Sequence, residues 1–434
     1  MDAFFFMSEI EKIYKIFKKA SGVYTDTRKP LINGVFIALK GSSFDGNTYA
    51  SKAIQQGACI AIVDDFETSK RNEKIIYVKD TYSTLKNLAN YHRKKLTCPV
   101  VAITGSNGKT TTKDLLKVVL EEGYETHATQ GNLNNHIGVP LTILNLPLSA
   151  ELSIIEMGAN HLKEIEELCK IAEPTHGFIT NFGKAHIEGF GSENGVVNGK
   201  SELYTYLTIS KGTVFVNLDN KNQVKKLGEA PFISFGQDEK SDYQVSYQNR
   251  NNKLEISFKG FKFKSSLHGE YNLKNIAAAI VIGNYFKVPI NKIQKAIESY
   301  KSSNNRSQLI KLKNYKIILD AYNANPSSME LAVKSFKKSY SNMNILILGD
   351  MLELGDYTLT AHKEIIRLAK KLSFSKIITV GENFKKTGIL LSNLEQFSTT
   401  KELIVHLENK PIKEENILIK GSRSMELEKI LTIL

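Results

Sequence analysis

This chain of 434 residues has no tryptophan, only three cysteines, and no apolar run long enough to span a membrane. A membrane helix needs about 20 consecutive apolar residues. The cysteines, Cys59, Cys98 and Cys169, are odd in number and widely separated, which argues against a disulfide framework or a zinc cluster. The apolar run at residues 4–6 lacks a preceding basic segment, so it is a poor signal peptide. We therefore expect a soluble, cytoplasmic protein without membrane insertion.

The net charge of +13 allows either a polyanionic small molecule or a nucleic acid as partner. The lysines are spread along the chain in short pairs such as Lys18-Lys19, and no dedicated basic arm is present. The absence of tryptophan removes one stacking platform for bases. We therefore expect small-molecule substrates, no nucleic acid, and a monomer.

The alternation of apolar runs predicts an α/β protein of three domains, at residues 1–97, 98–306 and 307–434. The first block has predicted strands at Val35–Leu39, Cys59–Val63 and Ile75–Val78, with a helix at Ser51–Gln56. Thr97-Cys98-Pro99 marks a boundary because proline favours extended backbone at itself and its neighbour. The polar, turn-rich segment Lys301–Ser307 marks the second.

The second and third blocks alternate strands and helices, which is typical of parallel sheets covered by helices. Predicted strands of the second block are Val100–Thr104, Leu152–Glu156, Gly177–Asn181 and Val214–Asn217, followed by antiparallel edge strands at Tyr243–Tyr247, Leu254–Phe258 and Phe261–Leu267. Predicted strands of the third are Tyr315–Asp320, Asn344–Leu348, Lys376–Val380 and Asn416–Lys420, with a last helix at Met425–Leu431. We expect a central ATPase-type domain and a Rossmann-like third domain, with ligands at the carboxyl ends of the strands.

A phosphate-binding loop is the strongest local signal. Gly105, Ser106, Asn107, Gly108, Lys109, Thr110 and Thr111 follow the Val100–Thr104 strand and open a helix. Glycines let backbone amides approach a phosphate, a lysine contacts its β and γ groups, and a threonine hydroxyl ligates Mg²⁺. The generic pattern has glycine at position 103, where this chain has Ile103, so a glycine turn with an incidental lysine is the alternative. The loop predicts handling of ATP or GTP and leaves the reaction open.

Three further residues lie near the ends of central strands: Glu156, His186 and Lys200. A carboxylate and an imidazole can share a divalent ion, although Mg²⁺ prefers oxygen ligands. From the residues alone, Glu156 could equally cap a helix, and His186 is more often a structural histidine.

Taken together and in order, these motifs resemble the Mur ligase superfamily of ATP-dependent amide-forming enzymes over nearly the whole chain. The matching segments are 26–28, 36–41, 44–46, the phosphate loop, 132–140, 156–161, 181–186, Lys200, 320–326 and 348–355. The segments Tyr322–Pro326 and Gly349–Gly355 are most similar to the members that add D-alanyl-D-alanine. The other muramoyl peptide ligases and folylpolyglutamate synthase are the alternatives within the superfamily.

The resemblance implies roles for the central residues. Lys109 and Thr110 would hold ATP and Mg²⁺, and Glu156 and His186 a second Mg²⁺. Lys200 resembles a lysine that carbon dioxide converts to a carbamate near the metal; an unmodified lysine that binds phosphate is the alternative. The remaining nucleotide contacts would be Asn275 at adenine, with Arg306 and Asp320 beside the ribose.

The resemblance also implies the substrate sites and the reaction. Asp26, Thr27, Arg28, Phe44, Asp45 and Gly46 resemble the uridine-diphosphate sugar site, where a turn and a surface ion pair are the alternative. Asn135, Asn323 and Asn325 would also contact substrates. The implied activity joins D-alanyl-D-alanine to UDP-N-acetylmuramoyl-tripeptide through an acyl phosphate, in peptidoglycan precursor synthesis. A domain hinge is expected at Ser302–Ser307.

A nucleotide switch or nucleic-acid-binding NTPase is the competing class, and its nucleic-acid affinity would fall steeply with salt.

Overall fold

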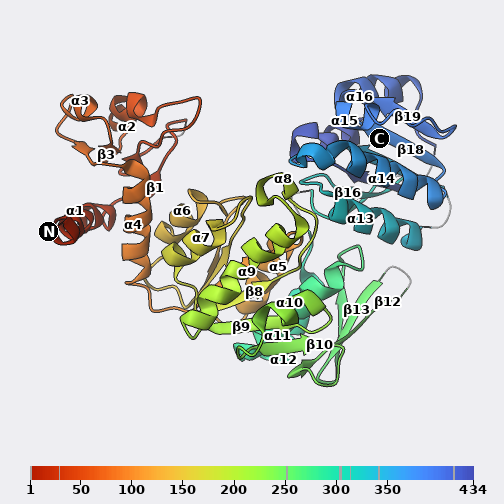
Figure 1. Cartoon of the computed structure of the whole chain (residues 1–434), viewed down its shortest axis with the longest axis horizontal. Helices are drawn as coiled ribbons and strands as arrows, with labels where there is room; N and C mark the ends of the chain where they lie inside the picture. Colours follow the sequence, from red (N-terminus) through yellow and green to blue (C-terminus); the bar gives the residue numbers. More distant parts are fainter. Residues whose placement is uncertain are drawn as a thin grey trace.

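The computed structural model describes residues 2–28, 30–250, 253–302, 305–312, 314–340, 343–413 and 416–434. Three α/β units follow one another in space, with the first and third at opposite ends of the molecule and the second between them (Figure 1). The predicted α/β class is confirmed. Among the described residues, no helix combines the length and the apolar character needed to cross a membrane.

The first unit is built on a four-stranded parallel sheet in the order β1-β2-β3-β4. Its elements are α1 (Asp2–Phe17), β1 (Val23–Tyr24), β2 (Val35–Ile37), η1 (Gly46–Tyr49), α2 (Ala50–Gln55), β3 (Ile60–Val63), α3 (Phe66–Ser69), β4 (Ile75–Tyr77) and α4 (Thr81–Arg93). The three predicted strands are confirmed; β1, α1 and α4 were not predicted. Helix α4 packs against α6 and α7 of the next unit, and one apolar cluster continues from Ile10 to Leu227 across this contact.

The second unit contains a seven-stranded parallel sheet in the order β11-β10-β9-β8-β5-β7-β6. Its strands are β5 (Val100–Thr104), β6 (Thr126–Ala128), β7 (Leu152–Glu156), β8 (His176–Ile179), β9 (Thr213–Asn217), β10 (Ile233–Gly236) and β11 (Tyr243–Gln244). Its helices are α5 (Lys109–Leu120), α6 (Gly138–Leu144), α7 (Glu164–Ala172), α8 (Ile187–Phe190), α9 (Glu193–Ile209), α10 (Lys221–Leu227), α11 (Asn272–Tyr285) and α12 (Ile290–Ser299). Strands β5, β7 and β8 end beside one another, so they carry the phosphate loop, Glu156 and the Asn181–His186 segment to one edge.

The predicted antiparallel strands at 254–258 and 261–267 are confirmed as a pair, but their predicted place at the edge of this sheet is wrong. Strand β11 continues the large sheet in parallel, and β12 (Ser246–Arg250), β13 (Lys253–Phe258) and β14 (Phe261–Ser265) form a separate antiparallel sheet. The reason is burial: the alternating apolar residues of β13, Leu254, Ile256 and Phe258, pack into the core that surrounds the apolar helix α11. Burial of these side chains against the helix stabilises the separate sheet.

The third unit has a six-stranded sheet in the order β15-β16-β20-β17-β18-β19, with only β15 antiparallel. Its elements are β15 (Gln308–Lys311), β16 (Lys316–Asp320), α13 (Pro326–Ser339), β17 (Asn344–Gly349), η2 (Gly355–Tyr357), α14 (Thr358–Lys371), β18 (Lys376–Val380), α15 (Glu382–Lys385), β19 (Leu394–Phe397), α16 (Thr400–Asn409), β20 (Asn416–Lys420), η3 (Arg423–Met425) and η4 (Leu427–Thr432). The four predicted strands are confirmed. The predicted helix Met425–Leu431 is two short 3₁₀ segments, because Glu426 adopts a left-handed conformation (φ 49°) between them.

Candidate active site

The phosphate loop between β5 and α5 requires glycine at two positions. Gly105 has φ +138°, and a Cβ there would lie 2.1 Å from Thr180 Oγ1. Gly108 has φ +79°, and a Cβ there would lie 2.7 Å from Asn275 Oδ1. Both the backbone conformation and the space exclude larger side chains, so glycine lets the loop pack closely against Thr180 and Asn275. The same contact places Asn275 of α11 directly against the loop, beside the first turn of α5.

The end of β8 holds the loop in shape. The Asn107 carbonyl accepts hydrogen bonds from Thr180 Oγ1 at 2.6 Å and Asn181 Nδ2 at 2.8 Å, and Ser106 Oγ accepts one from Gly183 N at 2.9 Å. Lys109 lies folded over its own loop, where Nζ donates to the Gly105 carbonyl at 2.6 Å. Burial lowers the pKa of Lys109. The loop is therefore preformed, with a desolvated cation inside its curve.

Glu156, the last residue of β7, has one carboxylate oxygen that is satisfied and one that is not. Oε1 accepts hydrogen bonds from Thr110 Oγ1 at 3.1 Å and from Asn134 Nδ2 at 2.8 Å. Oε2 is buried without a hydrogen-bond partner among the described residues, and Glu156 is only 1% exposed. A buried carboxylate oxygen without a partner is costly unless a cation binds it. The hard oxygen donors of Glu156 and Thr110 therefore fit a Mg²⁺ ion beside the phosphate loop.

His186 contacts the third unit instead of Glu156. Its Nδ1 lies 2.5 Å from Oε2 of Glu353, and both residues have left-handed backbone, with φ 54° and 61°. The hydrogen bond from His186 lowers the pKa of Glu353. No cluster of three or more His, Cys, Asp or Glu side chains in the described part of the chain is arranged to hold a metal. The predicted second Mg²⁺ site at Glu156 and His186 stays a prediction.

Lys200 of α9 is 1% exposed, and its Nζ donates to the Ala159 carbonyl at 2.7 Å. Its Nζ lies 4.9 Å from the centre of the Phe190 ring. The same ring packs against Gly199, where an added Cβ would lie only 2.4 Å from Phe190 Cε1. Burial, and then the charge of Lys109, lower the pKa of Lys200 well below the usual range. Burial therefore disfavours the charged form of this amine.

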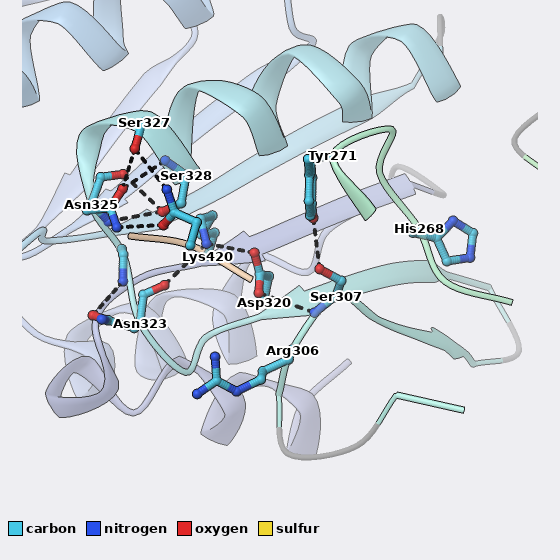
Figure 2. Close-up of polar contacts among 12 residues, drawn as sticks. His268, Tyr271, Arg306, Ser307, Asp320, Asn323, Asn325, Ser327, Ser328 and Lys420 are labelled. Carbon is cyan, nitrogen blue, oxygen red and sulfur yellow. Dashed lines mark hydrogen bonds and ion pairs between the residues drawn. The ribbon is translucent and has the colours of Figure 1, made fainter. Parts of the chain in front are cut away.

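A buried ion pair joins the ends of β16 and β20, neighbouring strands of the third unit's sheet (Figure 2). Lys420 Nζ lies 2.6 Å from Asp320 Oδ2 and also donates to the Asn323 carbonyl at 3.2 Å. Asp320 Oδ1 accepts from Ser307 N at 3.2 Å. The Arg306 guanidinium stacks 3.7 Å from the centre of the Tyr322 ring. Asp320 and Arg306, both predicted nucleotide contacts, thus lie at the junction between the second and third units.

The phosphate loop also contacts the third unit directly. Asn107 Oδ1 accepts a hydrogen bond from Asn325 Nδ2 at 2.7 Å, and Asn107 Nδ2 donates to Ser327 Oγ at 3.0 Å. Asn325 is the N-cap of α13, with a capping box that includes Ser328 (Figure 2). Asn107 of the predicted phosphate loop and Asn325, a predicted substrate contact, therefore meet at one interface.

Two cavities open at this interface. The larger, of about 940 Å³, includes Thr110, Lys113, Arg306, Tyr322 and Arg423 in its lining. The smaller, of about 210 Å³, is lined by Ala185, His186, Asn323, Ala324, Asn325, Leu352, Glu353, Ser422, Arg423 and Ser424. Arg423 borders both, so it stands where the two spaces adjoin.

The residues predicted for the sugar nucleotide lie in the first unit, away from this interface. Arg28 pairs with Asp26 at 2.6 Å, with both side chains at least half exposed, and Thr27 is buried. Asp45 caps η1, and a Cβ on Gly46 would lie 2.5 Å from the Leu39 carbonyl. Phe44 is 54% exposed. In the second unit, Asn135 Oδ1 accepts from Gly138 N at 2.8 Å at the start of α6. These assignments stay predictions.

Among the polar residues of the site that sequence reasoning missed are Asn134, Glu353 and Lys420. Each had a signal. Lys420 ends a predicted strand at the ligand edge of the third sheet, Glu353 lies in a matched motif, and Asn134 directly precedes a predicted site residue. Their partners, however, are 22, 167 and 100 positions away in the chain, at Glu156, His186 and Asp320.

Comparisons with known proteins extend over nearly the whole chain. Family models described as "Mur ligase family, catalytic domain", "Mur ligase middle domain" and "Mur ligase, glutamate ligase domain" match residues 19–94, 103–283 and 305–423. UDP-N-acetylmuramoyl-tripeptide--D-alanyl-D-alanine ligase from Bacillus subtilis (strain 168) is 34% identical, over 94% of this chain and 92% of the relative. The enzyme of that name from Escherichia coli (strain K12) is 31% identical, over 95% and 93%.

Solved structures agree with these relatives. MurF from Acinetobacter baumannii has a TM-score of 0.86 at 27% identity, covering 98% of this chain and 97% of that one. MurF ligase from Thermotoga maritima in complex with ADP has a TM-score of 0.84, covering 96% and 97%. At 24% identity, this second likeness shows the fold alone.

Proposed function

This chain belongs to the Mur ligase family, and from that premise we propose that it joins D-alanyl-D-alanine to UDP-N-acetylmuramoyl-tripeptide with conversion of ATP to ADP and phosphate. The curated relatives carry this activity in their names, at 28–34% identity over more than nine-tenths of the chain. The product is a cytoplasmic precursor of peptidoglycan. The observation that carries the proposal is the preformed phosphate loop, with its partly buried Lys109, beside the Glu156 oxygen that has no partner among the described residues.

A carboxylate does not condense with an amine in water without activation. The tripeptide carboxylate attacks the γ-phosphorus of ATP, the bond to the β-γ bridging oxygen breaks, and an acyl phosphate and ADP form. The free amine of D-alanyl-D-alanine then attacks the acyl carbon; the new C–N bond replaces the C–O bond to phosphate, which leaves. The Lys109 ammonium would stabilise charge on the phosphate oxygens, since burial has already removed much of its hydration.

Thr110 and Glu156 would hold Mg²⁺ at the phosphates, with His186 available for a second ion once it leaves Glu353. The metal would supply charge neutralisation at the transferring group. Asn134 fixes the orientation of the Glu156 carboxylate through its hydrogen bond to Oε1, which leaves Oε2 free for the cation. Nucleotide contacts are proposed at Asn275, Arg306 and Asp320.

We propose that carbon dioxide adds to Lys200 to form a carbamate. The buried amine has no carboxylate within hydrogen-bonding distance among the described residues, and its neutral form is the one that reacts. The neutral nitrogen bonds to the carbon of carbon dioxide, the electron pair of one C=O π bond moves to oxygen, and the nitrogen releases a proton, so an uncharged amine becomes an anion. That anion would offset the excess positive charge of Lys109 close by and help to arrange the metal site.

The domain division at residues 1–97, 98–306 and 307–434 is part of the same proposal. The first domain would hold the uridine diphosphate through Asp26, Thr27, Arg28, Phe44, Asp45 and Gly46, and Asn135 would contact the peptide. The third domain would close on ATP to exclude water, because water would hydrolyse the acyl phosphate. The proposed pivot at Ser302–Ser307 includes residues 303 and 304, which lie outside the described residues.

The test is product analysis by mass spectrometry with ATP, each candidate acceptor tripeptide, and D-alanyl-D-alanine. We expect ADP release to depend on both the uridine-linked tripeptide and the dipeptide, with a pentapeptide product. A panel that includes the substrates of the other muramoyl ligases and of folylpolyglutamate synthase separates the sibling activities. Strong ATP turnover without either substrate would contradict the proposal.

A further inference from the structure

A chain of hydrogen bonds crosses from the second unit to the third just before α11 (Figure 2). Tyr271 OH lies 2.8 Å from Ser307 Oγ, and Ser307 N donates to Asp320 Oδ1 at 3.2 Å. We infer that Tyr271 is a positioning residue, which holds the Asp320 carboxylate in place relative to the phosphate loop by way of Ser307. The inference rests on the nucleotide contacts of the proposed function.

Close packing fixes the ring of Tyr271. A Cβ on Gly269 would lie 2.3 Å from Tyr271 Cε1, and Gly269 has φ +88°, so the ring lies against backbone where only glycine fits. Burial, and then the charge of Asp320, raise the pKa of Tyr271, so its hydroxyl stays protonated at neutral pH. Tyr271 therefore presents a fixed, neutral hydroxyl to Ser307.

Ser307 needs such a tether because of its backbone conformation. Its φ of +44° lies in the left-handed region, which serine rarely adopts, and the residue is 8% exposed. Ser307 directly precedes β15, whose first residue, Gln308, pairs with Leu319 of β16. The Ser307–Asp320 hydrogen bond thus continues the end of this ladder. Without the bond from Tyr271, Ser307 would relax, and its N–H would no longer be held toward Asp320.

The segment that carries Tyr271 is also tied to the phosphate loop. Asn272 Nδ2 donates to the His268 carbonyl at 2.6 Å, and Asn275 Nδ2 donates to Asn272 Oδ1 at 3.0 Å. Asn275 in turn lies against Gly108 of the loop. One connected set of hydrogen bonds therefore joins Asn275, the proposed adenine contact, to Asp320, the proposed ribose contact.

A second contact of the same segment with the third unit is more exposed. Glu270 N donates to Ser335 Oγ of α13 at 3.3 Å, and the Glu270 carboxylate pairs with Lys338. The side chains of this ion pair are 39% and 62% exposed, and exposed pairs contribute little. The contact also reaches α13 and not Asp320. The spacing between the two nucleotide contacts is therefore set by Tyr271 and Ser307.

The decisive experiment compares the dissociation constants of ADP, 2′-deoxy-ADP and 3′-deoxy-ADP by titration calorimetry with Mg²⁺ present. A carboxylate beside the ribose accepts a hydrogen bond from a hydroxyl, so the unmodified protein should bind ADP about 10-fold more tightly than at least one of the deoxy nucleotides. In Tyr271→Phe, which keeps the ring against Gly269, this preference should fall to about 3-fold or less, because Asp320 is no longer held in place. The affinity for that deoxy nucleotide should hardly change.

Further variants separate this role from a general loss of stability. Ser307→Ala removes the same hydrogen bond from its other end and should reduce the preference equally. The double variant should match either single variant, because both changes remove one interaction. Tyr285→Phe is the matched control: its hydroxyl lies 3.5 Å from Thr213 Oγ1 at the other end of α11, so the preference should be unchanged.

A preference for ADP that survives in Tyr271→Phe overturns the inference. Additive effects in the double variant, or no preference in the unmodified protein, overturn it as well. Binding of ADP requires no turnover, so the inference is decided separately from the ligase activity. A protein that does not join the dipeptide, yet loses its ribose preference in Tyr271→Phe, would contradict the proposed function and support the inference.

Discussion

The ion pair between Asp320 and Lys420 predicts that Asp320→Asn destabilises the third unit strongly. Lys420 is 2% exposed, and its ammonium lies 2.6 Å from the Asp320 carboxylate. At an effective dielectric constant of about 20, two unit charges at that separation attract by roughly 6 kcal/mol. Desolvation of the two groups offsets several kcal/mol of this attraction.

Removing one partner leaves the desolvation of the other uncompensated, and such changes cost about 3–5 kcal/mol. Lys420 keeps its hydrogen bond to the Asn323 carbonyl, so we expect a loss near the lower end, about 3 kcal/mol. Lys420→Met should cost less, because the Asp320 carboxylate is 15% exposed and keeps the hydrogen bond from Ser307 N. The double variant should be more stable than Asp320→Asn alone, since it buries no unpaired charge.

Native-state hydrogen exchange of the amides of β16 and β20 is the appropriate assay, because it reports the free energy of opening of this sheet separately from the other two units. The ligand-free protein should be used, since Asp320 is also a proposed nucleotide contact. A cost of Asp320→Asn below about 1 kcal/mol would refute the reasoning, as would a double variant whose cost equals the sum of the two singles.

Two further predictions concern other buried groups. Although burial alone would raise it, hydrogen bonds from Asn47 and Lys40 hold the pKa of Asp64 below its usual value. Above its unfolded pKa of about 3.9, Asp64 therefore contributes to the free energy of unfolding, and this contribution is lost as the pH falls through the lower folded pKa. In Asp64→Asn, the free energy of unfolding of the first unit should fall less steeply with decreasing pH. An unchanged dependence on pH would contradict this. Lys200→Ala should abolish ligation, and a short-chain carboxylate should partly restore it. ¹³C NMR under ¹³C-labelled carbon dioxide should show a carbamate resonance in the unmodified protein only. Full activity of the variant would remove Lys200 from the mechanism.

Local patterns in the sequence were sufficient for much of the fold. Val100–Thr104, Leu152–Glu156, Lys376–Val380 and Asn416–Lys420 were predicted with the observed bounds, because continuous β-branched and apolar runs between turn residues are typical of buried parallel strands. Edge strands such as β15 and β19 were missed, since their pairing partners, and not their composition, make them strands. The antiparallel strands at 254–258 and 261–267 were predicted, but their separation from the large sheet was missed, because packing against α11 decides which surface they cover.

The sequence alone determined the phosphate loop, with its glycines, lysine and threonine. A loop and the helix that follows it are local structures, so the residues they need are adjacent in the chain. Only the tertiary structure decided what surrounds that loop. The unpartnered oxygen of Glu156, the depressed pKa of Lys200, the His186–Glu353 contact and the cavity at Arg423 all depend on burial and on groups brought together from distant segments. Desolvation and charge pairing act through space, so no window of sequence contains them.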